Sequence, residues 1–180
     1  MKKILMTMIT LSIIVVGCGQ ETSSNSENTS LEKITNEIGI YAIEDFKNIG
    51  FKINKEYDVS ELEGSTGAWF GFWKNNLNKA IDYEIRIYPS QQLSIDKGVV
   101  FVEEVIGEDA VLKKSTSSWK EGIQDRRSRN ISSMRGSESN SVRAKYMDYI
   151  IYGNTIILCA GLDSNYARQN CSDLANSLNK

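Results

Sequence analysis

Two stretches in which hydrophobic and polar residues alternate predict β-hairpins in this chain. The first pairs residues 67–73 (GAWFGFW) with residues 81–88 (IDYEIRIY) across a turn rich in Asn and Lys. The second pairs residues 146–152 (YMDYIIY) with residues 155–160 (TIILCA), which flank the tight-turn dipeptide Gly153-Asn154. The strict alternation over 81–88 is typical of a strand whose two faces meet different surroundings.

Hydrophobic residues at helical spacing predict three helices. The first begins at a capping-box sequence, Thr29-Ser30-Leu31-Glu32, and ends at Gly50. The second follows Pro89-Ser90, and the third follows a cap at Asp163 or Ser164. The stripes that define these helices are, in order, Leu31, Ile34, Ile38, Tyr41 and Phe46; Ile95, Val99, Val102 and Ile106; and Ala167, Cys171, Leu174 and Leu178. Residues 51–54 alternate briefly and predict one more short strand.

The order of these elements is helix, hairpin, helix, hairpin, helix. It predicts an α+β fold in which an antiparallel sheet of about four strands, two from each hairpin, carries helices packed on one face. Residues 31–180 are long enough to form one hydrophobic core. We therefore expect a single globular domain over this range.

The N-terminal segment has the pattern of an export signal. Lys2 and Lys3 precede an uncharged run of 13 mostly apolar residues, 4–16. A helix of that length spans about 20 Å, which is too short for a bilayer core of about 30 Å. It matches the apolar region of a secretory signal peptide, with a stop-transfer anchor as the alternative.

The four residues that end this run, Val15-Val16-Gly17-Cys18, resemble the lipobox of bacterial lipoproteins. The resemblance implies that residues 1–17 are removed as a signal peptide and that a diacylglyceryl group is attached to the Cys18 thiol. Fatty acids such as palmitate would then fix the chain to the cell membrane or the outer membrane, facing the extracytoplasmic space. An unmodified cysteine is the alternative. Residues 19–30 (GQETSSNSENTS) are polar and predict a flexible tether.

Composition narrows the function. The chain has 180 residues, a formal charge of −2 and no His, which excludes His-based general bases, His-containing triads and His-ligated metals. Phosphate-binding loops, nucleophile elbows, dinucleotide fingerprints and calcium loops are also missing from the sequence. We therefore expect no cofactor and no metal, and the acidic balance argues against nucleic acid as a partner.

Cys159 and Cys171 are candidates for a disulfide. One lies near the end of the last predicted strand and the other on the inward stripe of the last predicted helix. An exported protein meets an oxidising compartment, which favours a bridge. Two buried thiols remain an alternative, and a redox pair is another, although the Cys-x-x-Cys spacing is missing.

The first predicted hairpin carries a candidate ligand site. If Ala68, Phe70 and Phe72 join the core, the opposite face holds two aromatic rings together with a carboxylate and a guanidinium, which suits a planar or sugar-like ligand. The candidate residues are Trp69, Trp73, Glu84, Arg86 and Tyr88. In the alternative interpretation, Glu84 and Arg86 simply pair and the tryptophans are buried.

A long polar segment around residues 113–145 carries a net positive charge. Such a loop is a candidate for contact with anionic lipid or a wall polymer, because bases near a charged surface attract it. The alternative is a solvated loop that balances an acidic domain. Its bases are Lys113, Lys114, Lys120, Arg126, Arg127, Arg129, Arg135, Arg143 and Lys145, of which the first seven are the candidate contacts.

Together these features predict a lipid-tethered, non-enzymatic domain that binds a ligand or partner, with the membrane, a wall polymer or an envelope protein as possible partners. A small envelope enzyme of the carboxylate-dependent hydrolase type, or an accessory subunit, is the second hypothesis. A purely structural envelope protein is the third.

Overall fold

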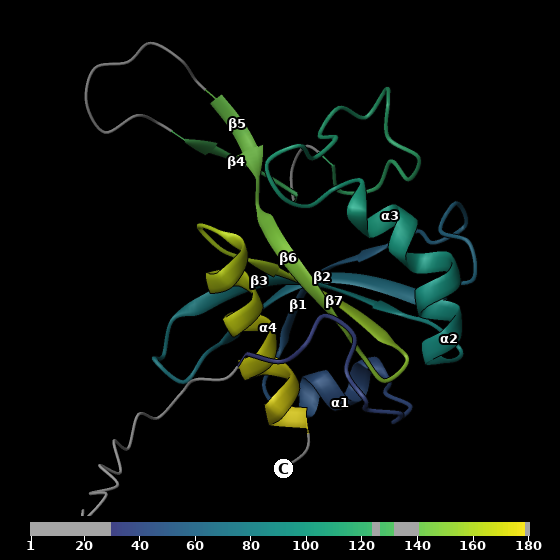
Figure 1. Ribbon diagram of the computed structural model, residues 1–180, viewed down its shortest axis with the longest axis vertical. Coiled ribbons are helices and arrows are strands. Elements are labelled where there is room, and N and C mark those ends of the chain that lie inside the picture. The colour runs from purple at the N-terminus through teal and green to yellow at the C-terminus, as the bar shows by residue number, and fades with distance from the viewer. Residues whose placement is uncertain (1–29, 124–126, 132–140, 179–180) are drawn as a thin grey trace, which may run out of the picture.

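The computed structural model describes residues 30–123, 127–131 and 141–178. Five antiparallel strands form the main sheet in the order β1-β2-β3-β7-β6, and two more strands, β4 and β5, form a separate ladder (Figure 1). The strands are β1 (Lys52–Tyr57), β2 (Gly67–Lys74), β3 (Ala80–Ile87), β4 (Ser128–Ile131), β5 (Ser141–Ala144), β6 (Tyr146–Tyr152) and β7 (Thr155–Ala160). The helical segments are α1 (Ile43–Asn48), α2 (Gln91–Leu93), the π-helical η1 (Ser94–Gly98), α3 (Val99–Glu103) and α4 (Ser164–Leu178).

The predicted α+β class and both predicted hairpins are confirmed. Strands β2 and β3 pair over their whole length, and β6 pairs with β7 across the turn at Gly153, whose φ of +54° lies in the left-handed region that glycine tolerates. The sheet has five strands rather than about four, because β1 also pairs with β2.

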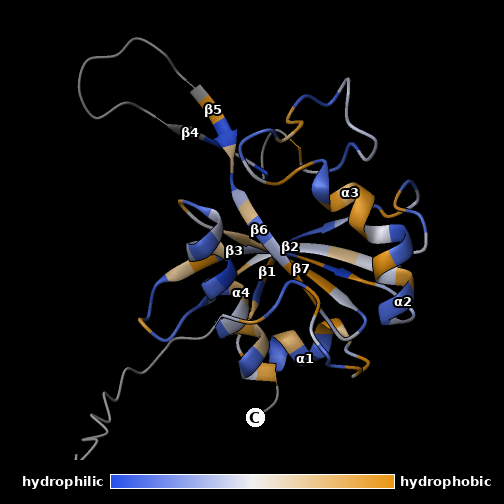
Figure 2. Cartoon of the chain, viewed as in Figure 1, coloured by the Kyte–Doolittle hydropathy of each residue, from blue (hydrophilic) through white to orange (hydrophobic). Residues whose placement is uncertain are grey.

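Helices cover both faces of the sheet, whereas the sequence pattern predicted one. Helix α4 and the short α1 pack on the face that carries Ile157 and Cys159, and α3 packs on the face that carries Ile156 and Leu158. Figure 2 shows why, since β7 is mostly hydrophobic and lies between helices that each have a hydrophobic and a hydrophilic side. A strand that is apolar on both faces needs a cover on each.

The first predicted helix is mostly wrong, because only Ile43–Asn48 is helical. The chain before it follows the edge of β6 instead: the amide of Thr35 donates to the carbonyl of Ile151 at 3.0 Å, and the amide of Ile151 donates to Lys33 at 2.7 Å. These bonds pair backbone groups on the exposed edge of β6 that would otherwise lack a partner strand. The spacing of hydrophobic residues in the sequence does not reveal this long-range pairing.

The two later helices are confirmed. The segment after Pro89 is helical from Gln91 to Glu103, although its middle part is π-helical, and Ser90 caps it by accepting a bond from the Leu93 amide. Helix α4 is capped by Asp163, whose carboxylate accepts from the Tyr166 amide at 2.8 Å.

Candidate functional site

The sheet separates the five residues of the predicted aromatic site. Trp69 lies directly opposite Ile85 in the β2–β3 ladder, whereas Ala68 lies opposite Arg86 and Phe70 opposite Glu84. Cross-strand partners share a face, so the tryptophans occupy one face and the charged pair occupies the other. The prediction of a single outward cluster is therefore wrong.

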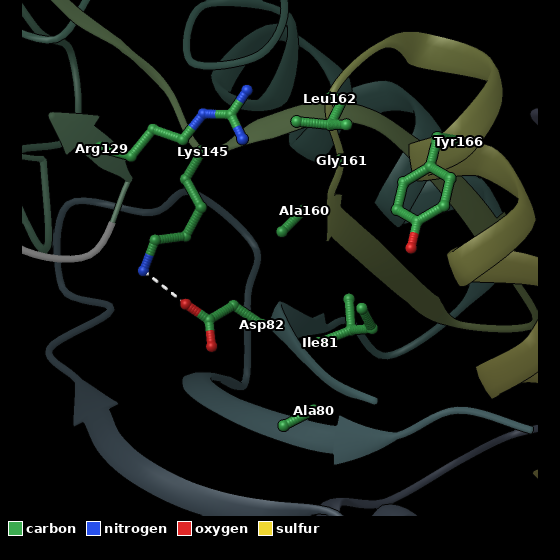
Figure 3. Close-up of a pocket in the computed structure, with 9 residues that line it drawn as sticks. All are labelled: Ala80, Ile81, Asp82, Arg129, Lys145, Ala160, Gly161, Leu162 and Tyr166. Atoms are coloured by element: carbon green, nitrogen blue, oxygen red, sulfur yellow. Dashed lines mark hydrogen bonds and ion pairs between the residues drawn. The ribbon is translucent and has the colours of Figure 1, made fainter. Parts of the chain in front are cut away.

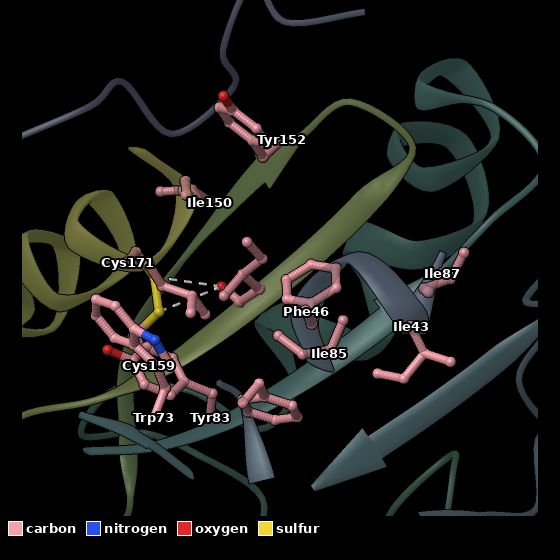
Figure 4. Close-up of a cluster of buried hydrophobic side chains, with 14 of the residues drawn as sticks. Ile43, Phe46, Trp73, Tyr83, Ile85, Ile87, Ile150, Tyr152, Cys159 and Cys171 are labelled. Atoms are coloured by element: carbon pink, nitrogen blue, oxygen red, sulfur yellow. Dashed lines mark hydrogen bonds between the residues drawn. A yellow bond between two sulfur atoms is a disulfide. The ribbon is translucent and has the colours of Figure 1, made fainter. Parts of the chain in front are cut away.

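Both of these faces are covered. Trp73 is buried beside the disulfide and Tyr83 (Figure 4), and its indole nitrogen donates to the carbonyl of Ile49 at 2.9 Å. Trp69 is half-buried and, with Tyr88, lines a shallow apolar pocket of about 340 Å³ next to Tyr41. The cover over the two tryptophans comes from α1 and from α4, and α4 lies far from β2 in the sequence.

Glu84 and Arg86 form an internal ion cluster with Arg127, and all three side chains are fully buried. The Glu84 Oε1 accepts from the Arg86 Nε at 2.8 Å and from the Arg127 Nη2 at 2.9 Å, while its Oε2 accepts from the Arg127 Nε at 2.7 Å. The alternative that Glu84 and Arg86 simply pair is confirmed, with Arg127 as an unforeseen third member. We call these three residues the buried ion cluster.

The Trp119 ring and the mutual attraction of Glu84 with the two arginines stabilise the buried ion cluster. The Trp119 ring lies 4.3 Å from the Arg127 guanidinium carbon and 4.9 Å from that of Arg86, which places both cations against one aromatic surface. Burial opposes ionisation of Glu84, but the attraction of Arg127 and Arg86 outweighs it and holds the pKa of the Glu84 carboxyl below its ordinary value. Glu84 therefore stays charged inside the fold.

The predicted disulfide is formed. Cys159 of β7 and Cys171 of α4 are bridged with their Cα atoms 5.6 Å apart, and both residues are fully buried (Figure 4). The bridge fastens α4 to the sheet.

The basic segment does not act as one surface. Lys113, Lys114 and Lys120 are exposed on the loop after α3, whereas Arg127 belongs to the buried ion cluster and is unavailable for surface contact. That part of the prediction is wrong, because Glu84 draws Arg127 into the core. Arg126 and Arg135 lie outside the described residues.

The ladder of β4 and β5 forms an arm that projects from the sheet, since β5 leads directly into β6 (Figure 1). Its base is fixed by two backbone bonds: the Arg127 amide donates to Gly122 at 3.0 Å, and the Lys145 amide donates to Arg127 at 2.8 Å. The loop predicted over 113–145 therefore contains a hairpin whose root is held in the core.

Two open pockets that share part of their lining lie between the base of this arm, the beginning of β3 and the start of α4, and we call them together the arm pocket and each of them a chamber. Its first chamber, of about 390 Å³, has apolar walls from Ile81, Ala160 and Leu162, with the Tyr166 ring on one side (Figure 3). Lys145 crosses the chamber and donates to Asp82 at 2.6 Å. This ion pair balances the charge of Lys145, so Arg129 is the remaining charged residue on the wall of the chamber.

The second chamber of the arm pocket, of about 220 Å³, shares Arg129 and Leu162 with the first. Arg129 and Arg143 lie directly opposite each other in the β4–β5 ladder and both line the chamber. Neither forms an ion pair with an acid among the described residues, and the Nε of Arg129 is buried without a hydrogen-bond partner there. The exposed Glu108 also lines the chamber but makes no ion pair with either arginine.

This arrangement suits recognition of an anion. Two like charges directly opposite on a ladder repel each other, so an anion between them would relieve the repulsion. In the parts of the chain that the structure describes, no group of three or more Cys, Asp or Glu side chains could hold a metal ion. In the same parts, no helix has the length and apolar composition needed to cross a bilayer.

The sequence missed most of the arm pocket. Arg129 was in the predicted basic surface, but Asp82, Leu162 and Tyr166 come from three other elements and carry no motif. The pairing of Arg129 with Arg143 depends on the register of a hairpin whose strands have only four residues each, which is too short for periodicity to detect.

The fold and the arm pocket define a small α+β domain with a basic cavity at its edge. Residues 42–180 match the profile of a family described as a family of unknown function (DUF6810), and the chain belongs to that family. No curated protein and no solved structure shows significant similarity to the chain. The match begins at the cap of α1, so the lipobox-like residues and the polar stretch 19–30 precede it.

Proposed function

We propose that this protein is a bacterial lipoprotein, fixed by acyl chains on Cys18 to the extracytoplasmic side of a membrane, whose domain binds an anionic ligand of the cell envelope without chemical conversion. The lipobox-like residues Val15-Val16-Gly17-Cys18 support the anchor. The buried bridge between Cys159 and Cys171 supports an oxidising compartment, where such bonds form and persist.

The observation that carries the binding function is the guanidinium pair of Arg129 and Arg143 in the arm pocket. Both side chains line one cavity and neither has an acidic partner within 4.0 Å in the described ranges. A guanidinium that serves stability is expected to resemble Arg127, which is paired with a carboxylate and fully buried. Unpaired guanidinium groups beside a cavity are instead available for a ligand.

The anchor is tested by mass spectrometry of the protein isolated from a bacterial membrane. We expect a mature chain that begins at a diacylglyceryl-modified Cys18, and a Cys18→Ala variant that takes up no radiolabelled palmitate. An intact Met1 terminus or an unmodified Cys18 thiol in the wild-type protein contradicts the anchor.

The binding function is tested with inorganic phosphate as the probe. The lipidated protein in neutral phosphatidylcholine nanodiscs is dialysed to equilibrium against radiolabelled phosphate at low ionic strength, with empty nanodiscs as the blank. We expect binding that Arg143→Ala removes and that Lys113→Ala, an exposed base outside the arm pocket, leaves unchanged. Equal binding by all three proteins, or none by the wild type, contradicts the proposal.

A further inference from the structure

We infer that the arm pocket binds a phosphate monoester that carries an apolar substituent. The phosphate lies in the second chamber, which Arg129 and Arg143 line and which we call the guanidinium chamber. The substituent lies in the first chamber, which we call the apolar chamber. This inference rests on the proposed function and names the class of its ligand. It follows from the contrast between the two chambers and from their shared wall, which Arg129 and Leu162 form together.

The guanidinium chamber favours a phosphate over a carboxylate. One guanidinium already satisfies both oxygens of a carboxylate in a bidentate pair. Arg129 and Arg143 present two guanidinium groups from opposite positions of the ladder, and one of their donors, the buried Nε of Arg129, has no partner among the described residues. A terminal phosphate has three oxygens and up to two negative charges, so it can accept from both arginines at once.

The apolar chamber provides no second anion site. Of the two cations that line it, Arg129 belongs to the wall shared with the other chamber, and the Lys145 ammonium is already bound to Asp82 at 2.6 Å. The remaining wall is made by Ile81, Ala160, Leu162 and the Tyr166 ring. A ligand that filled both chambers would therefore carry charge at one end only.

Two large side chains on this wall are unusually open to solvent. Leu162, in the loop before α4, is 74% exposed, and Tyr166, in the first turn of α4, is 39% exposed (Figure 3). Covering them with an apolar group removes their surface from water, which is favourable in proportion to the area covered. A cavity of about 390 Å³ is within the range of small-molecule sites, so the substituent has room for a short alkyl chain or a ring.

A homologous series of ligands separates the two chambers. The lipidated protein in neutral phosphatidylcholine nanodiscs is dialysed against radiolabelled inorganic phosphate, methyl phosphate, butyl phosphate and hexyl phosphate, with empty nanodiscs subtracted. We expect the affinity to rise along the series by up to about fourfold for each methylene that becomes buried. Hexanol, which has no charge, should not bind, and hexanoate should bind more weakly than hexyl phosphate.

Variants assign each contribution to its chamber. Tyr166→Ala should flatten the rise with chain length and leave the affinity for inorganic phosphate unchanged, because Tyr166 lines the first chamber and not the second. Leu77→Ala removes a side chain that is 71% exposed and lies outside both chambers, so it should change neither quantity. Arg143→Ala should abolish binding of every member of the series.

The outcomes distinguish this inference from the function on which it rests. Equal affinity for inorganic phosphate and hexyl phosphate overturns the inference and leaves an anion-binding function standing. Binding of hexanoate as tight as that of hexyl phosphate overturns the choice of phosphate. Absence of binding by any of these probes overturns the proposed function as well.

One further experiment identifies the source of the phosphate ester. Phosphatidic acid, a lipid whose headgroup is a phosphate monoester, replaces a tenth of the phosphatidylcholine in the nanodiscs. Displacement of hexyl phosphate by this lipid supports a lipid headgroup as the ligand, and unchanged hexyl phosphate binding supports a soluble ester.

Discussion

Arg127 and Arg129 are two residues apart in the chain, yet the first is enclosed in the buried ion cluster and the second lines the arm pocket. Arg127 makes two hydrogen bonds to Glu84 and lies against the Trp119 ring at 4.3 Å. Arg129 is half-buried, faces Arg143 across the ladder and has no acidic partner in the described residues. The same side chain therefore holds the fold together at one position and is open to a ligand at the next.

The contrast teaches that the partner, and not the residue type, decides the role of a basic side chain. A buried charge pair costs desolvation on both sides and repays it only with good geometry, which the three bonds to Glu84 provide. Arg129 avoids most of that cost because the residue is only half-buried, although its Nε is enclosed.

The largest effect is expected for Glu84→Gln. The change leaves the Arg86 and Arg127 guanidinium groups buried without a negative charge, a loss of about 3–5 kcal/mol in the free energy of unfolding. Chemical denaturation followed by fluorescence measures it. Glu56→Gln, an exposed carboxylate on β1, should stay within about 0.5 kcal/mol of the wild type. A loss no larger than that of the control would show that the cluster is dispensable.

The stability difference between the wild type and Glu84→Gln should depend on pH. Because the folded-state pKa of Glu84 is lowered, its contribution is fully present above the unfolded pKa of about 4.3 and is lost as the pH falls through the folded value. The gap in unfolding free energy between wild type and Glu84→Gln should thus be constant from pH 7 to pH 5 and shrink below pH 4. A constant gap down to pH 3 contradicts the lowered pKa.

The next effect is expected at the disulfide. Replacing Cys159 and Cys171 together by Ala removes a bridge that closes a short loop, which costs about 3 kcal/mol in the chain-entropy model. Thermal unfolding of the double variant measures the loss. The wild type should show no free thiol at these positions in native conditions, and a titration that finds two would contradict the bridge.

Different parts of this molecule were accessible to sequence reasoning for physical reasons. The β2–β3 and β6–β7 hairpins were predicted because alternation and the Gly153-Asn154 turn are local signals. The face assignment of Trp69 failed because alternation alone does not say which face is covered, and both are. The cover over Glu84 comes from a loop that ends at Arg127, 43 residues later, and no local pattern encodes such a contact.

Local sequence patterns also fail to predict most of the arm pocket. Arg129 was included in the basic surface by charge alone, which the geometry refines by placing it opposite Arg143 and removing Arg127 from the set. Tyr166 follows the predicted cap of α4, so its place in a helix could be predicted. That it lines the same pocket as Ile81 and Lys145 depends on how β3, β7 and the arm assemble.

Conservative substitutions at the two arginines sharpen the comparison directly. Lysine keeps the charge but not the planar pair of donors. Arg127→Lys should lose at least one charged hydrogen bond to Glu84 and about 1.5–3 kcal/mol of stability. Arg129→Lys should stay within about 0.5 kcal/mol, because its head group has no partner in the described residues to lose. Urea denaturation of both variants tests this, and equal losses would abolish the distinction.

A small loss of stability, together with a gain in phosphate affinity, is expected for Asp82→Asn. The ion pair with Lys145 is partly exposed, at 37% for the Asp82 side chain and 15% for that of Lys145, so its loss should cost less than about 1 kcal/mol. Removal of this negative charge should also make the arm pocket more positive and raise the affinity for inorganic phosphate severalfold, an effect that salt screens. Equilibrium dialysis at two ionic strengths measures the change. Stability and binding then move in opposite directions, which a purely structural role for the Lys145 pair does not predict. Phosphate binding that is unchanged or weaker would place the anion outside the arm pocket.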